Sequence, residues 1–414
     1  MFQVRNFISL FSFGFIIQLN VSAQSQLIDS LKNAYRTQTN DTMICKALNQ
    51  LASKERSEGW QKYYIELQER ADKGLAKYKD TNHQKFYKFQ IYCAKEYAAY
   101  FERLKGNNDL SIQLHLEAYR YAEELKKFNS MGNINNSIAQ LYYLKADAKN
   151  ALDYYQKALT NYERINDSSG MAKVLNNIGT VHNDFGEKEL ARAYFKNALG
   201  YSLSLQNPLL IGSGYNNIGS VLADEKKYDS ALYYFLKAQP FYQDAGLLYE
   251  EGTTLTNIGS MYQFKNEKSK ALSYFEQGLE RSKQAESSEG IASSYCYLAD
   301  IWFELNNLEK AKQFAESALT LGNEMGTPDI ISKAAFQLSR IYKSKGDYKK
   351  AFEMNELYTQ MKDSIDNEDA KRILMKSQFQ FEYGKKAAAD SLKSLKDKEV
   401  LSLQIEKEKN QKIF

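Results

Sequence analysis

The stretch Leu175-Asn176-Asn177-Ile178-Gly179 returns as Tyr215-Asn216-Asn217-Ile218-Gly219 and again as Leu255-Thr256-Asn257-Ile258-Gly259, so that one period separates each copy from the next. One such pentapeptide carries no information about the fold. Three copies at one spacing define an internal repeat, and a period of this length is typical of solenoids built from stacked copies of one unit.

The same register extends in both directions along the chain. Stepping by the period from Gly179 gives a column of small residues: Ala99, Ala139, Gly179, Gly219, Gly259, Ala299 and Ser339. A second small column follows at a constant distance behind the first: Ser111, Ala151, Ala191, Ala231, Ala271, Ala311 and Ala351. The columns stay aligned over seven units without an insertion, so we expect seven copies of one structural element.

Each unit contains two apolar patterns at helical spacing with a turn signal between them. Leu175 and Ile178 belong to the first pattern, and Ala191 and Phe195 belong to the second. The turn signals are Gly106-Asn107-Asn108, Gly186, Asn306-Asn307 and Gly346. A unit is therefore predicted to be a helix, a short turn and an antiparallel helix, whose backbones approach closely at the small columns.

These residues resemble the tetratricopeptide repeat. The matching positions are Asn177-Ile178-Gly179, Gly186, Ala191, Phe195 and Ala198. The resemblance covers roughly positions 41–371, and its units are longer than the common length of about 34 residues. It implies an all-α fold, a right-handed superhelix of antiparallel helix pairs, which in this chain is followed by one long C-terminal helix.

The regions outside the array have distinct compositions. Residues 1–23 are typical of a signal peptide, with Arg5, an apolar run over residues 7–19 and the cleavage signal Val21-Ser22-Ala23. A retained membrane anchor is the alternative, but a span needs about 20 apolar residues. We therefore expect the mature chain to be periplasmic or otherwise extracytoplasmic.

The remaining boundaries follow from the register. Residues 24–85 are predicted to form N-terminal helices with a degenerate first repeat, residues 86–371 the seven units, and residues 372–414 one charged, coiled-coil-like helix. The alternative for residues 372–414 is a solvated and partly frayed helix. Pro208 and Pro328 fall where one unit passes to the next and are expected to end second helices. Pro240 lies inside a second helix and is expected to kink or end it.

The sequence offers no constellation for catalysis. It contains no glycine-rich phosphate loop, HExxH, CxxC or nucleophile elbow. Cys45, Cys93 and Cys296 are expected to be small buried residues, and His115 and His182 to pack in columns otherwise filled by aromatic residues. We expect no enzyme activity, metal or cofactor. The net charge of +4 implies no strong attraction to nucleic acid.

The predicted function resides in a surface. First helices of such a solenoid line its concave face, where extended partners bind. The candidate peptide-binding residues on that face are Asn136, Asn176, Asn177, Thr180, Asn216, Asn217, Ser220, Asn257, Ser260 and Tyr297. An amide both donates and accepts hydrogen bonds, so a row of asparagines can hold a peptide backbone without reading its side chains.

Tetratricopeptide proteins commonly use the asparagine before the Ile-Gly pair in this way, a role that the resemblance gives to Asn177, Asn217 and Asn257. The alternative is that the asparagines cap or bridge neighbouring repeats. Towards the C-terminal half the groove becomes aromatic, with Tyr297, Phe303, Phe336 and Phe264, which indicates an apolar anchor pocket there.

The tail carries a second resemblance. Lys362-Asp363-Ser364-Ile365, the run from Gln378 to Lys386 and the charged helix after it resemble the juxtamembrane part of repeat-containing membrane receptors of Bacteroidota. In those proteins a histidine kinase, a SpoIIE-type phosphatase or a DNA-binding output follows one membrane span. The resemblance implies a sensing region that dimerises through its C-terminal helix. The alternative is a free periplasmic scaffold or assembly factor without signalling output.

Overall fold

The computed structural model describes residues 21–55 and 59–365, and within these ranges the chain forms helices and turns without a strand. The helices are α1 (Val21–Thr37), α2 (Asp41–Lys54), α3 (Gln61–Lys77), α4 (Thr81–Leu104), α5 (Asn108–Glu124), α6 (Phe128–Leu144), α7 (Ala148–Glu163), α8 (Ser168–Asp184), α9 (Lys188–Ser204), α10 (Pro208–Asp224), α11 (Tyr228–Asp244), α12 (Leu248–Phe264), α13 (Lys268–Gln284), α14 (Ser288–Glu304), α15 (Leu308–Met325) and α16 (Pro328–Ser344). Residues 348–365 are also helical. The predicted tail helix, 372–414, and most of the predicted signal peptide lie outside the described residues.

The helices from α4 onwards form antiparallel pairs at the predicted period. The pairs are α4/α5, α6/α7, α8/α9, α10/α11, α12/α13, α14/α15 and α16 with residues 348–365. Upstream of them, α2 packs against α3, and α1 packs against α2. The all-α solenoid predicted from the columns is confirmed, and its first in-register helix begins at Thr81.

A single turn motif joins the helices throughout the array. A residue with positive φ recurs at every half period from Gly106 to Gly346, and it ends first and second helices alike. At the α8–α9 turn the N–H of Gly186 donates to the carbonyl of Asn183, and the N–H of Glu187 donates to the carbonyl of His182. These are the two bonds of a left-handed helix cap. The turn signals Gly106, Gly186, Asn306 and Gly346 were correctly placed.

The two helices of a pair meet where a small residue faces a large ring. A Cβ on Gly179 would lie 2.6 Å from the ring of Phe195, and one on Gly259 would lie 2.6 Å from the ring of Phe275. Carbon atoms in contact are normally about 3.5–4.0 Å apart. The rings therefore occupy the space that a Cβ would need, as the predicted close approach of backbones requires.

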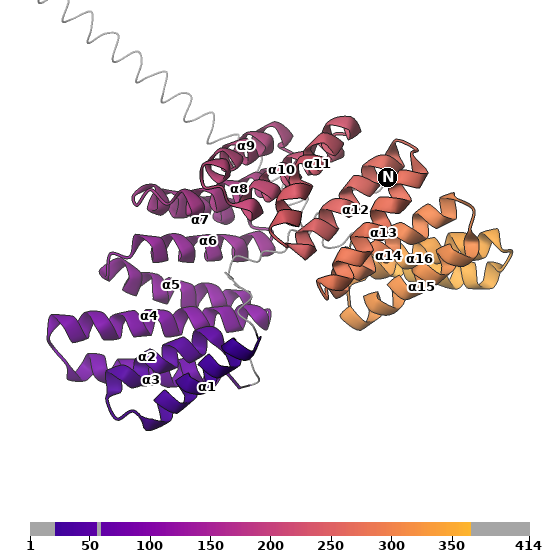
Figure 1. Ribbon diagram of the computed structural model, residues 1–414. Coiled ribbons are helices and arrows are strands. Elements are labelled where there is room, and N and C mark those ends of the chain that lie inside the picture. Colours follow the sequence, from indigo (N-terminus) through magenta and orange to yellow (C-terminus); the bar gives the residue numbers. More distant parts are fainter. Residues whose placement is uncertain (1–20, 56–58, 366–414) are drawn as a thin grey trace, which may run out of the picture.

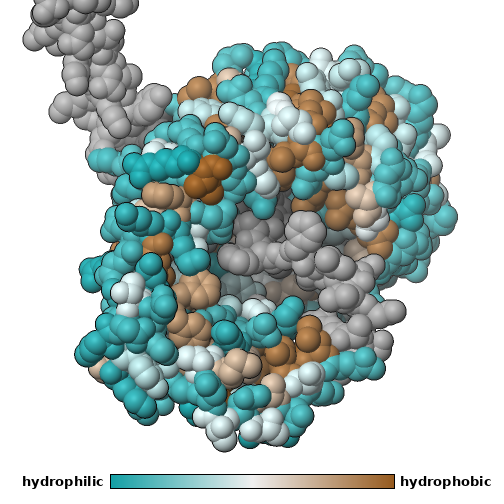
Figure 2. Space-filling view, turned by 60° about the vertical axis from the view of Figure 1, so that its left-hand side comes forward, coloured by the Kyte–Doolittle hydropathy of each residue, from teal (hydrophilic) through white to brown (hydrophobic). Residues whose placement is uncertain are grey.

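The helix pairs follow one another along a curved path (Figure 1). The first helices α6, α8 and α10 contact one another in succession, as do α12, α14 and α16. In the described part of the chain, no second helix makes a comparable contact with the second helix of the next pair. Neighbouring units are thus closest along the first helices, which is the arrangement expected if these helices line the inner side of the curve. The space-filling view shows that the molecule is hollowed (Figure 2).

The prolines act differently from the expectation. Pro208 and Pro328 do not end second helices; each is the first residue of a first helix, α10 and α16. The missing N–H has no partner at that position in any helix, so proline begins a helix there without losing a bond. Pro240 does not end α11, which continues to Asp244.

Candidate functional site

The predicted asparagines form a ladder that links adjacent first helices. The amide Nδ2 of Asn177 donates to Oδ1 of Asn136 over 3.0 Å, and Asn217 donates to Asn176 over 2.9 Å. The third rung runs from Asn257 to Asn216 over 3.3 Å. We call these six residues the asparagine ladder. It spans α6, α8, α10 and α12 and bridges neighbouring repeats, which was one of the two roles considered from the sequence.

In each rung, each of the two side-chain amides uses only one of its two polar groups. The asparagine on the upstream helix uses its Oδ1 and keeps the two N–H donors of its Nδ2, while the downstream one uses Nδ2 and keeps its Oδ1 acceptor. Asn176, Asn177 and Asn216 are half-buried. Asn136, Asn217 and Asn257 are buried. The ladder therefore leaves the Oδ1 acceptor of Asn177 and the Nδ2 donors of Asn176 and Asn216 partly accessible along the first helices.

The predicted hydroxyl groups bond within their own helices. Thr180 donates to the carbonyl of Asn176 over 3.1 Å, Ser220 to that of Asn216 over 3.0 Å, and Ser260 to that of Thr256 over 3.0 Å. Ser220 and Ser260 are buried. Each of these three hydroxyl groups donates its hydrogen bond to the backbone carbonyl four residues earlier in the same helix. The three side chains therefore add little polar surface to the groove.

The aromatic residues further along the array have partners within the protein. The ring of Tyr297 stacks on that of Phe275 at 5.2 Å, and Phe264 stacks on Tyr228 at 4.8 Å. Phe303 and Phe336 both lie against the Arg340 guanidinium, whose carbon is 4.2 Å and 5.5 Å from the two ring centres. The aromatic end of the groove thus contains a cation, which the sequence analysis did not place there.

The histidines and cysteines pack as predicted. His115 and His182 are buried, and their Nδ1 atoms lie 2.7 Å from Glu96 and 2.5 Å from Glu187. All three cysteines are buried and unpaired. Among the described residues no group of three or more His, Cys, Asp or Glu side chains is arranged to hold a metal ion, and no helix there is long and apolar enough to cross a membrane.

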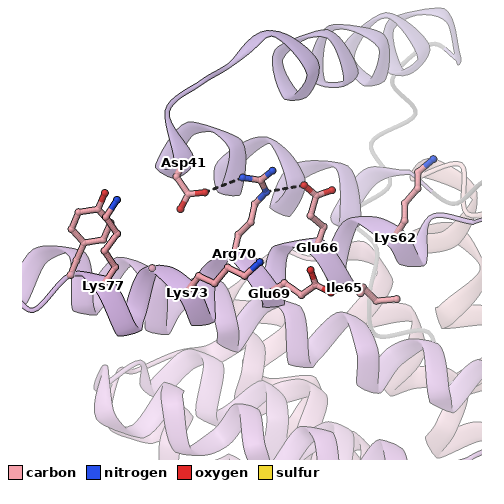
Figure 3. Close-up of a pocket in the computed structure, with 10 residues that line it drawn as sticks. Asp41, Lys62, Ile65, Glu66, Glu69, Arg70, Lys73 and Lys77 are labelled. Carbon is pink, nitrogen blue, oxygen red and sulfur yellow. Dashed lines mark hydrogen bonds and ion pairs between the residues drawn. The ribbon is translucent and has the colours of Figure 1, made fainter.

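A separate hollow of about 730 Å³ lies on the N-terminal helices (Figure 3). At its centre Arg70 bonds Asp41 over 3.1 Å and Glu66 over 2.8 Å, and Tyr87 donates to the other oxygen of Asp41 over 3.1 Å. This network joins α2, α3 and α4, and its positive and negative charges pair with one another. Because it lies outside the repeat register, periodicity did not reveal it.

Comparison with known proteins agrees with the geometry. The tetratricopeptide-repeat family models match residues 130–201, 210–284 and 332–363. Among curated proteins no significant match was found.

Several solved structures share the fold. The quorum sensor NprR from B. thuringiensis, in its apo form, aligns with a TM-score of 0.57 at 16% identity, over 81% of this chain and 92% of its own. A Rap protein complexed with competence and sporulation factor gives 0.54 at 14% identity, over 84% and 97%. The Rap conjugation gene regulator of plasmid pLS20, in complex with the Phr* peptide, gives 0.53 at 19% identity, over 83% and 96%.

Proposed function

Because the chain carries tetratricopeptide repeats, we propose that it is a non-catalytic module whose concave face binds a peptide or an extended segment of a protein. The asparagine ladder carries this proposal. Its half-buried members offer the acceptor of Asn177 and the donors of Asn176 and Asn216. The edge of an extended backbone offers the complementary N–H and carbonyl groups.

The ladder suits a ligand that is read through its backbone. The helices that carry it recur at one period from α6 to α12, so its half-buried amides follow one another along the first helices. The fold is shared with a Rap protein in complex with the Phr* peptide, which supports a peptide as the class of ligand.

The test is a peptide array probed with the labelled protein. We expect a subset of extended peptides to bind, and the double variant Asn177→Ala/Asn216→Ala to weaken binding of every one of them, because both side chains are half-buried and keep a free polar group. Two lost backbone hydrogen bonds correspond to about tenfold to a hundredfold in affinity. Asn197→Ala on the exposed face of α9 is the matched control and should bind as the wild type.

Equal affinity of the ladder variant and the wild type for these peptides would contradict the proposal. Thermal unfolding of both variants identifies a loss of binding that comes from unfolding alone.

We further propose that the module is the periplasmic sensing region of a signal-transduction receptor. The signal-peptide pattern of residues 1–23 and the tail's resemblance to receptor juxtamembrane segments support this. In the alternative, a periplasmic scaffold, the repeats bind partners without output. Sequencing the gene past codon 414 separates the two: a span followed by a kinase, phosphatase or DNA-binding domain supports the receptor, and a stop codon supports the scaffold.

A further inference from the structure

The first helix of the last unit, α16, places a cation on the concave face. Arg340 occupies the same repeat position as Thr180, Ser220 and Ser260, the column that follows the small residue by one. Asp300 occupies this position one unit earlier, and Arg340 Nη1 donates to its Oδ1 over 3.0 Å. The groove therefore changes from neutral and polar along the ladder to charged at its C-terminal end.

The Arg340 guanidinium is held in a fixed orientation, but only part of its hydrogen-bonding capacity is used within the protein. The rings of Phe303 and Phe336 lie against it, and stacking of this kind fixes the orientation of an arginine. Of its five N–H donors, the bond to Asp300 engages one. The side chain remains 35% exposed.

The bond to Arg340 uses only one oxygen of the Asp300 carboxylate. Its second carboxylate oxygen, Oδ2, accepts a hydrogen bond from Gln263 over 2.9 Å, so the carboxylate is shared between α12 and α16. Lys343, three residues after Arg340 on the same helix, is exposed and adds a second positive charge next to it. A pre-oriented guanidinium with spare donors matches the planar geometry of a carboxylate.

We propose that Arg340 recognises a carboxylate of the bound peptide, either an acidic side chain or the C-terminal carboxylate. This inference rests on the proposed function, because it requires a ligand on the concave face. The ladder ends at Asn257 on α12, and Arg340 lies two units further along the same face. For Arg340 to contact it, a peptide held by the ladder has to continue along the first helices as far as α16.

The test uses peptides that the array identifies, each synthesised in matched forms and measured by fluorescence anisotropy. One form exchanges Asp or Glu for Asn or Gln, and the other exchanges the C-terminal carboxylate for a carboxamide. The form whose neutralisation weakens binding identifies the source of the carboxylate. We expect the preference for the acidic form to be about tenfold, the value of one hydrogen bond to a charged group.

Three variants separate recognition from a purely structural role. Arg340→Gln should abolish the acid preference and leave the affinity for the neutral form unchanged. Asp300→Asn should increase the preference, because it removes the competing internal carboxylate. Arg340→Glu should reverse the preference towards peptides with Lys or Arg. A structural ion pair predicts instead that Arg340→Gln and Asp300→Asn act in the same direction.

An acid preference that survives Arg340→Gln would overturn the inference, as would equal weakening of all peptides by both Arg340→Gln and Asp300→Asn. Ladder-dependent binding without any acid preference overturns this inference alone. If no peptide binds in a ladder-dependent way, the proposed function itself fails.

Discussion

Replacing Gly179 by alanine tests whether close backbone approach sets the packing of a pair. The new Cβ would lie 2.6 Å and 2.7 Å from two ring atoms of Phe195, about 1 Å inside normal carbon contact. Phe195 is buried, so the ring has little room to move. Overpacking of this kind costs about 1–3 kcal/mol, against a gain of about 1 kcal/mol in helix propensity. We expect a net destabilisation of up to about 2 kcal/mol.

The sign of this effect should depend on the ring. In a Phe195→Ala background the obstructing atoms are gone, and Gly179→Ala should then stabilise by about 1 kcal/mol through helix propensity alone. Gly200→Ala is the matched control, because Gly200 lies inside α9 with no atom within 4 Å of its would-be Cβ. It should stabilise by about 1 kcal/mol in either background.

The assay has to report on one pair, because long repeat arrays lose overall cooperativity. Native-state hydrogen exchange of the core amides in α8 and α9 gives the free energy of opening that pair in each variant. The reasoning is refuted if Gly179→Ala has the same effect with and without the Phe195 ring, or if it stabilises the wild-type background as much as Gly200→Ala does.

Three further predictions concern single side chains. Asn217→Ala removes the 2.9 Å bond to Asn176 and should lower the opening free energy of the neighbouring helices by about 1 kcal/mol, measured by hydrogen exchange. Burial raises the pKa of the Cys296 thiol to about 12, so at pH 8 it stays protonated and should react with a disulfide reagent only after unfolding, whereas an exposed thiol with a pKa of about 8.5 reacts readily. Leu232→Ala should cost about 2–3 kcal/mol in urea titration, while Phe352→Ala, at the same repeat position but 62% exposed at the end of the array, should change stability by under about 0.5 kcal/mol.

Features that repeat along the chain could be predicted from sequence, because the same residue pattern occurs in seven units. The pairing of helices, the turns at Gly186 and Gly346, and the close approach at Gly179 all follow from residues within one unit. Local patterns such as these depend on helical spacing and turn chemistry, which a sequence states directly.

Features that depend on contacts between units were harder to predict. The ladder partners Asn136 and Asn177 are 41 residues apart, so only the stacking of neighbouring first helices decides whether their amides meet. The sequence therefore left ligand contact and bridging as open alternatives. The pairing of Arg340 with Asp300 has the same origin, and the Asp41–Arg70 contact outside the register had no periodic signal at all.

Because the same turn recurs at every half period, the array can be shortened, provided that whole units are removed. First and second helices end in the same turn, so the turns do not distinguish the two kinds of helix. Only the small and aromatic columns distinguish them. Removing one full period, from a turn to the next equivalent turn, joins matching faces and yields a shorter array of the same kind. Removing half a period also joins two intact turns, yet it directs every later groove residue towards the opposite face.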